Sequence, residues 1–330
     1  MYEILFFIWG ISRNNHTFVQ LINQSTRTMR TFAQSERSCE ASFQNAGPYW
    51  HAYTSGKNTP VLFTCKEDLA FVMNVIAQAA SLLLPKNIVI ITFEVMNNHF
   101  HFILSGDREL IMEFFAFIRK RLKRTIPNTD GLELQLKPIE SLSALRNGIV
   151  YTNRNGYVAI SDYTPFSYPW GCGRYYFNDI PLHQRFGEVF LGSKREMFRG
   201  RAPELPDNWL MTDGYIAPPS YCALLFGMSL FRDAHHYFNA LTKQVESYSE
   251  VAVDIDDDYF LTDTELFSKV MITIRETYKL DSLRQLTRAQ LLDFARALRH
   301  KYRSSNGQIR RVLGLSQYDV NALFPLSAES

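Results

Sequence analysis

The sequence predicts an α+β fold: a small antiparallel sheet with helices on one face, followed by an all-α C-terminal domain. Strand-like and helix-like segments alternate between residues 48 and 156. A loop-rich stretch follows, and helical periodicity alone characterises the chain from residue 262 onward. Alternation of this kind within a short region is typical of helices packed on one face of a mainly antiparallel sheet.

Each element is predicted from its residue pattern. Aromatic and β-branched residues predict strands over residues 49–54, the histidine-bearing run that ends at 104, and 132–136. Apolar residues at helical spacing predict helices over 66–84, 108–125 and 141–155. Ser141 is a suitable N-cap for the third helix, and Gly156 is expected to end it.

The composition limits the class of protein. The chain has 330 residues, a net charge of +2 and 14% aromatic residues. Its length suggests two or three compact units, and any nucleic-acid partner must bind local basic patches. The four cysteines form no C-x-x-C pair, so we expect a reducing, cytoplasmic location. The apolar run at residues 2–11 is shorter than the roughly 20 residues of a membrane span, so no membrane partner is expected.

Two histidines lie at the end of the apolar run 88–95. Side chains of a strand alternate between faces, so His99 and His101 point to one side and Phe100 and Phe102 to the other. Their backbones are about 7 Å apart, which lets both imidazoles bind one divalent metal. The alternative is a pair of partly exposed strand histidines.

A tyrosine and an asparagine share a face of the predicted helix 141–155. Tyr151 and Asn155 are four residues apart, which is one helical turn. An Asn carbonyl is an acceptable ligand for a hard metal beside two imidazoles. Attack of a phenolate on a metal-polarised phosphodiester is covalent nucleophilic catalysis. Taken alone, the spacing is more typical of a pair on a helix surface.

Two further regions are candidate DNA contacts. The end of helix 108–125 carries five cations in six residues: Arg119, Lys120, Arg121, Lys123 and Arg124. Some cations suit the C-terminal end of a helix dipole, but this cluster favours phosphate contact over a solvated face.

Near the C-terminus, a short helix breaks at Gly314 and Ser316 caps the next, as in a helix-turn-helix. Its candidate DNA-binding residues are Arg310, Arg311, Gln317 and Tyr318. Arg310 stands where a small residue is usual, and two surface helices joined by a glycine turn are the alternative.

The motifs together resemble those of the HUH-type tyrosine transposases, in the REP-associated branch. Met96-Asn-Asn-His-Phe-His101 is similar to M-P-N-H-x-H, and Tyr151-Thr-Asn-Arg-Asn-Gly156 to Y-x-x-x-N-P. Tyr168-Pro-Trp-Gly-Cys172 is similar to the Y-P-W-S-S that commonly follows. The order and spacing agree over residues 48–176. Asn and Gly replace the two prolines and Gly-Cys the two serines, which leaves every expected ligand and the nucleophile in place.

The resemblance implies a ferredoxin-like core and a transposase-like enzyme that nicks and joins single-stranded DNA, often beside a hairpin. His99, His101 and Asn155 would bind Mg²⁺ or Mn²⁺, and Tyr151 would form a 5′-phosphotyrosine intermediate. A homodimer is one assembly that this family allows. Two alternatives stay open: a catalytically silent DNA-binding regulator on the same fold, and a metal-dependent phosphoesterase that uses water.

These expectations divide the chain into four segments. Residues 1–47 are a variable N-terminal extension, and residues 48–180 are the transposase-like catalytic domain. Residues 181–258 are a loop-rich and helical connector. Residues 259–330 form a helical DNA-binding domain that contains the helix-turn-helix.

Overall fold

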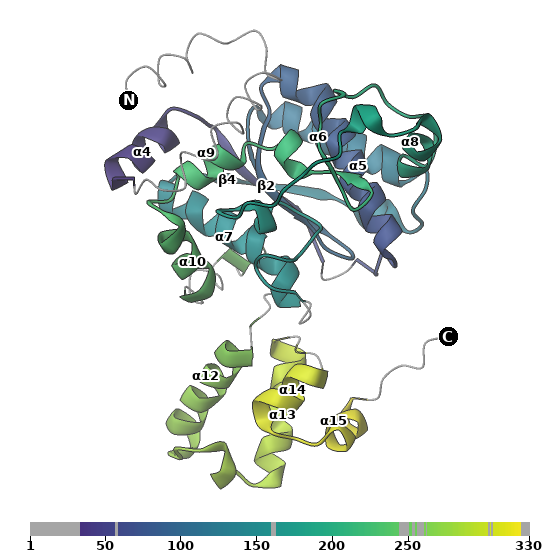
Figure 1. Cartoon of the computed structure of the whole chain (residues 1–330). Helices are drawn as coiled ribbons and strands as arrows, with labels where there is room; N and C mark the ends of the chain where they lie inside the picture. The colour runs from purple at the N-terminus through teal and green to yellow at the C-terminus, as the bar shows by residue number, and fades with distance from the viewer. Residues whose placement is uncertain are drawn as a thin grey trace. The chain divides into compact units, whose positions relative to one another are not determined.

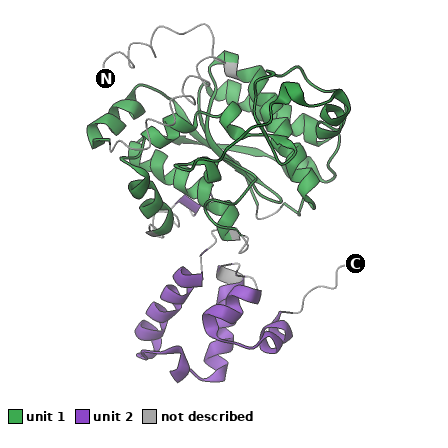
Figure 2. Cartoon of the chain, viewed as in Figure 1, with its two compact units in different colours: residues 1–244 green, residues 245–330 purple. Residues whose placement is uncertain are grey.

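The computed structural model describes residues 34–56, 59–159, 163–243, 251–252, 255, 261, 263–302, 304 and 306–324. The apolar run at residues 2–11 lies outside these ranges. The chain divides into two compact units, residues 1–244 and residues 245–330 (Figure 2). The boundary expected at residue 180 therefore lies inside the first unit. Within the described ranges, no helix has both the length and the apolar character that crossing a bilayer requires.

The first unit is built on a four-stranded antiparallel sheet with the strand order β2-β3-β1-β4. The strands are β1 (Tyr49–Thr54), β2 (Val89–Val95), β3 (Phe100–Ser105) and β4 (Leu134–Ile139). This confirms the α+β class. The prediction of a single strand ending at residue 104 is wrong, because β2 and β3 are two strands of a hairpin. The turn between them is closed by the Met96 amide, which donates to the His99 carbonyl at 2.9 Å.

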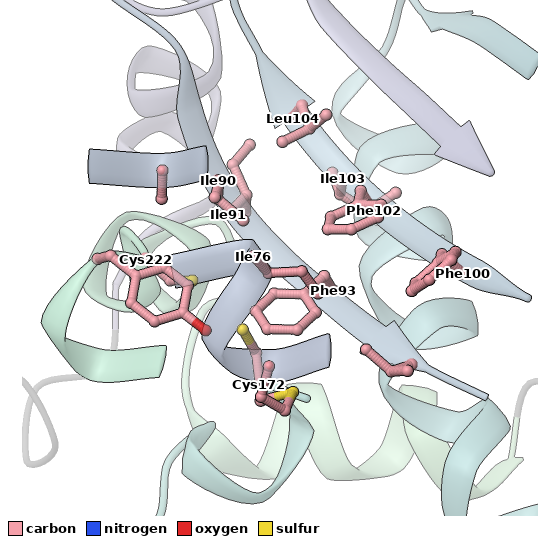
Figure 3. Close-up of a cluster of buried hydrophobic side chains, with 14 of the residues drawn as sticks. Ile76, Ile90, Ile91, Phe93, Phe100, Phe102, Ile103, Leu104, Cys172 and Cys222 are labelled. Carbon is pink, nitrogen blue, oxygen red and sulfur yellow. The ribbon is translucent and has the colours of Figure 1, made fainter. Parts of the chain in front are cut away.

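Helices cover both faces of this sheet (Figure 1). The helices α5 (Lys66–Leu83) and α6 (Arg108–Leu122) share one face. There Phe114 of α6 meets Phe102 with ring centroids 5.6 Å apart, and Ile76 of α5 lies beside Phe93 (Figure 3). The expectation of helices on one face holds for this pair only.

The helix α7 (Leu142–Ala159) packs on the opposite face. A Cβ on its Gly148 would lie 3.1 Å from the Ile103 side chain, and Ile103 points away from Phe102. The alternation of helices and strands could not reveal this, because element order does not specify which face a helix covers. Ser141 caps α7 as expected, accepting from the Ala144 amide at 3.1 Å.

The remaining parts of the first unit pack around these layers. They are α4 (Glu36–Gln44), α8 (Leu191–Met197), α9 (Leu224–Ser229), α10 (Ala234–Lys243) and the short strands β5 (Met211–Thr212) and β6 (Tyr215–Ile216). Single turns of 3₁₀-helix cover Leu84–Lys86, Thr129–Gly131, Gly173–Tyr175, Phe186–Glu188 and Pro218–Ser220. Residues 34–47, which belong to the predicted variable N-terminal extension, contain α4. Its Glu36 forms an ion pair with Arg146 of α7 at 2.6 Å.

The second unit is helical in its described residues, as expected. It contains α12 (Asp263–Thr273), a π-helical turn (Ile274–Tyr278), a 3₁₀ turn (Leu283–Gln285), α13 (Arg288–Lys301), α14 (Asn306–Leu313) and α15 (Gln317–Leu323). Gly314 has a φ of +65°, a left-handed conformation that suits glycine between two helices. The Ser316 hydroxyl accepts from the Asp319 amide at 3.1 Å and caps α15. The two short helices, the break at Gly314 and the cap at Ser316 are thus confirmed.

Candidate active site

The two motif histidines converge, as their spacing predicted. His99 ends the turn before β3 and His101 lies on β3, with ring centroids 4.9 Å apart and nearly perpendicular planes. His101 has no exposed surface and His99 is 6% exposed. The alternative of two partly exposed histidines is therefore excluded.

Tyr151 reaches the same place from the helix that covers this face. Its ring centroid lies 5.3 Å from that of His101, with an interplanar angle of 81°. Asn155 follows one turn later on α7, and both side chains are buried. The alternative interpretation of Tyr151 and Asn155, as an exposed pair on the helix surface, is thereby excluded. The structure brings Tyr151 and the histidine pair together and places Asn155 on the same buried stretch of α7.

A third histidine, which the motifs did not indicate, belongs to the cluster. His51 of β1 is buried, and its Nε2 lies 3.2 Å from Nδ1 of His101. Its ring centroid is 5.8 Å from that of Tyr151. His51 lies in the predicted strand 49–54, but only the pairing of β1 with β3 brings it beside His101.

Asn98 orients the other histidine. Its Nδ2 donates to the carbonyl oxygens of Gly56 and Thr59, at 2.9 and 2.8 Å. Its Oδ1 is then turned toward Nδ1 of His99, 2.6 Å away. Gly56 is required for this approach, because a Cβ there would lie 2.7 Å from the same ring nitrogen. The turn thus fixes the His99 ring through one amide.

Glu94 is a buried carboxyl on the histidine face of the sheet. It lies opposite His101 in the β2–β3 pairing, and its Oε2 accepts from the Gly156 amide at 2.8 Å. Burial raises the pKa of Glu94 well above its usual value. A Cβ on Gly156 would overlap the Tyr168 ring and this carboxyl. A glycine at position 156, which keeps its backbone N–H and has no Cβ, therefore fits this contact.

The helix α7 does not end at Gly156, contrary to expectation, but continues to Ala159. The polar residues between its two motif positions hold it in place. The hydroxyl of Thr92 donates to Oδ1 of Asn153, whose Nδ2 donates to the Tyr237 hydroxyl at 3.0 Å. Arg154 donates to the Leu241 carbonyl at 2.9 Å. These buried contacts fix the rotation of α7 and hence the position of Tyr151.

The segment Tyr168–Cys172 packs along the outer side of β2. The Val95 amide donates to the Trp170 carbonyl at 2.8 Å, and the Cys172 amide to the Phe93 carbonyl at 2.9 Å. The segment is therefore packed against the edge of the sheet. Gly171 is needed here, because a Cβ would lie 2.5 Å from the Phe93 carbonyl oxygen.

The basic cluster of α6 is partly used inside the protein. Arg121 donates to the Phe198 carbonyl at 3.0 Å, and burial lowers the pKa of this guanidinium. Lys123 pairs with Asp130 at 2.5 Å, and Arg119 donates to the Asp130 backbone at 3.0 Å. Lys120 and Arg124 are exposed, and these two are best placed to meet a phosphate.

The helix-turn-helix residues lie mainly on the surface of the second unit. Tyr318 is 82% exposed, and Arg310 and Gln317 are exposed as well. Gln317 donates to Asn321 one turn later at 2.8 Å. Arg311 forms an ion pair with Asp263 of α12 at 2.5 Å. Arg310, Gln317 and Tyr318 are thus accessible to a ligand, while Arg311 also joins α14 to α12.

A divalent metal would depend on the asparagine. Among the described residues, no group of three or more His, Cys, Asp or Glu side chains is arranged to hold a metal ion. Two imidazole nitrogens and an amide oxygen nevertheless form a donor set that suits borderline and hard divalent cations. No family model, curated protein or solved structure matches the chain. The candidate site is therefore defined by its own geometry.

Proposed function

We propose that this chain is a metal-dependent single-stranded DNA endonuclease and strand transferase that uses Tyr151 as its nucleophile. The observation that carries the proposal is the separation of 5.3 Å between the Tyr151 and His101 rings. Tyr151 lies on a helix and His101 on a strand. The two side chains meet although they come from different layers of the fold, as a shared site requires. A nucleophile adjacent to metal ligands is the arrangement that covalent phosphoryl transfer needs.

The topology supports the same assignment. The order β1-α5-β2-β3-α6-β4, together with the sheet order β2-β3-β1-β4, supports a ferredoxin-like core. The helices α5 and α6 cover the apolar face of this core. The additional helix α7 then delivers Tyr151 to the face that bears the histidines, which agrees with the arrangement expected of an HUH enzyme.

The chemistry follows from the residues present. A Mg²⁺ or Mn²⁺ ion held by His99, His101 and Asn155 would polarise the scissile phosphodiester. Tyr151 loses its phenolic proton and its oxygen attacks the phosphorus, while the bond from phosphorus to the 3′ oxygen breaks. The leaving oxygen takes up a proton and becomes a 3′-hydroxyl, and the 5′-phosphate stays on Tyr151. Attack of a 3′-hydroxyl on this ester rejoins the strands without ATP.

The exposed cations of α6 lie at the same end of the sheet as His99. A turn of two residues joins β3 to α6, so the helix runs back across the sheet and ends near the start of β3. Contacts link the two regions: Arg119 donates to the Asp130 carbonyl, a Cβ on Gly131 would lie 4.0 Å from Thr59, and the Thr59 carbonyl accepts from Asn98. Lys120 and Arg124 are therefore suited to contact the backbone of a strand that enters the site.

The decisive experiment is detection of the covalent intermediate. Wild-type protein incubated with single-stranded hairpin DNA and Mn²⁺ is expected to give a protein–DNA adduct that survives denaturation. Tyr151→Phe should abolish this adduct. Tyr157→Phe, the same chemical change on the same helix, is the matched control and should retain it. An adduct in Tyr151→Phe contradicts the proposal, and cleavage by the wild type without any adduct assigns the reaction to water instead.

One observation favours a second function, that of a catalytically silent DNA-binding regulator. Neither Tyr151 nor His101 has exposed surface, so a phosphodiester reaches the tyrosine oxygen only if neighbouring groups move. Helices α14 and α15 would then provide the DNA contacts. Hairpin binding by the wild type with no adduct under any metal condition would identify this function.

A further inference from the structure

Nδ1 of each of the two motif histidines lies within hydrogen-bond distance of a neighbouring side chain. Nδ1 of His99 lies 2.6 Å from Oδ1 of Asn98, and Nδ1 of His101 lies 3.2 Å from Nε2 of His51. In both rings the nitrogen engaged by a neighbouring side chain is Nδ1. In the proposed site each ring would bind the metal through Nε2, which requires a lone pair, and not a proton, on that atom.

For His99 the hydrogen bonds of Asn98 indicate the position of the proton. Asn98 donates from Nδ2 to two backbone carbonyls, which can only accept. The oxygen of the amide is thereby directed at His99, and this oxygen also can only accept. His99 consequently carries its proton on Nδ1 when neutral, and its Nε2 presents a lone pair.

For His101 the position of the proton depends on another histidine. If His51 donates, the neutral His101 carries a proton on Nε2 and cannot bind a cation there. If His101 donates, its Nε2 presents a lone pair, as that of His99 does. The two arrangements have the same heavy-atom distance of 3.2 Å but opposite consequences for a metal.

We infer that His51 is a positioning residue whose Nε2 accepts the Nδ1 proton of His101 and holds Nε2 of His101 ready for the metal. This inference rests on the proposed function, since it assigns a role within that metal site. A histidine ligand commonly donates its second N–H to a buried acceptor, which fixes the tautomer and the ring orientation.

The surroundings of His51 hold its own ring in place. It is 3% exposed, and the rings of Tyr53 and Tyr151 lie 5.3 and 5.8 Å from it. Its strand is paired on both sides, with β3 and with β4. A buried ring on a central strand has little freedom to turn away, so the acceptor stays beside His101 with or without a metal.

The test begins with the metal-free protein. Two-dimensional ¹⁵N–¹H spectra of the imidazoles should show His101 protonated on Nδ1 in the wild type. His51→Gln should keep this tautomer, because the amide oxygen of glutamine can occupy the place of Nε2. His51→Phe keeps the ring volume but removes the acceptor, and should lose the preference. Tyr53→Phe, a polar change on the same strand and face, is the matched control and should resemble the wild type.

The second readout is Mn²⁺ affinity, measured by electron paramagnetic resonance. His51→Phe should weaken binding about 10- to 100-fold, the usual cost of losing such a partner, and His51→Gln should restore most of it. A wild-type His101 protonated on Nε2, or unchanged Mn²⁺ affinity in a folded His51→Phe variant, overturns the inference alone. If the wild type binds no Mn²⁺, the proposed metal site fails and the role of His51 fails with it.

Discussion

The two faces of the central sheet differ in what they bury. The face under α5 and α6 is apolar, with Phe93, Phe100 and Phe102 among its fully buried side chains (Figure 3). The face under α7 buries three polar side chains, His51, Glu94 and His101. These are removed from water about as completely as the phenylalanines of the other face. Burying a polar group is costly unless it is hydrogen-bonded. One face therefore contributes mainly stability, and the other accepts a cost that a functional site explains.

This comparison predicts the largest loss of stability for truncation on the apolar face. Phe102 stacks on Phe93 at 5.5 Å and meets Phe114 edge-on at 5.6 Å. Phe102→Ala should lower the free energy of unfolding by about 3 to 5 kcal/mol in urea titrations, since it leaves a cavity. Phe190→Ala is the control, because Phe190 is 84% exposed and should change stability by less than about 0.5 kcal/mol. Equal effects of the two changes would break the comparison.

A smaller loss is expected where a glycine of α7 lies against a buried carboxyl of the polar face. Gly156→Ala should destabilise the protein by about 1 to 3 kcal/mol, because the added methyl overlaps Tyr168 and Glu94. This outweighs the gain of about 1 kcal/mol that alanine brings to a helix interior. Gly192→Ala in α8 meets nothing within 4 Å and should be neutral or stabilising. Thermal melts of both variants measure the difference, and a stabilised Gly156→Ala would show that α7 can move away from the sheet.

The buried carboxyl of this face predicts a pH dependence. The folded-state pKa of Glu94 is raised, so its contribution to stability is present below the unfolded value near 4.5 and is lost as the pH rises through the folded value. Glu94→Gln removes this titration. The wild type should lose stability relative to the variant above about pH 4.5, by at most about 1.4 kcal/mol per pH unit. Melting temperatures across pH 4 to 8 measure this, and parallel profiles would show that Glu94 does not titrate there.

The smallest effect on stability is expected outside both faces, at the exposed cations of α6. Replacing Lys120 and Arg124 by glutamine should leave the free energy of unfolding within about 0.5 kcal/mol. It should reduce the salt dependence of single-strand binding by about 1.4 in the slope of log K against log[salt], for two lost phosphate contacts. Arg37→Gln with Lys66→Gln, two exposed cations elsewhere in the unit, is the control. An unchanged slope would remove α6 from the DNA-binding surface.

The parts of the site that the sequence predicted are those that local periodicity determines. Alternation of side chains along an extended segment places His99 and His101 on one side, and a helix places Tyr151 and Asn155 on one face, whatever surrounds them. His51 and Glu94 could not be predicted in this way. Their positions beside His101 depend on the pairing of β1 and β2 with β3, which joins residues far apart in the chain or across an unrecognised turn.

The errors in the fold have the same origin. The run 88–104 is predicted as one strand because β2 and β3 are both buried and apolar almost throughout, and only Asn97 and Asn98 mark the turn. The face covered by α7 depends on the small Gly148 and on polar contacts such as that of Asn153 with Thr92. Neither is visible without the sheet beside it.

The two outer strands of the sheet also bear on how the protein avoids self-association. At the β2 edge, Val95, Phe93 and Ile90 already bond to the backbones of Trp170, Cys172 and Ala223. At the β4 edge, Pro138 has no N–H to donate to an additional strand. An added strand at the β2 edge would have to displace existing backbone hydrogen bonds. At the β4 edge it would find no N–H donor at Pro138. Both borders therefore oppose the edge-to-edge growth that leads to aggregates.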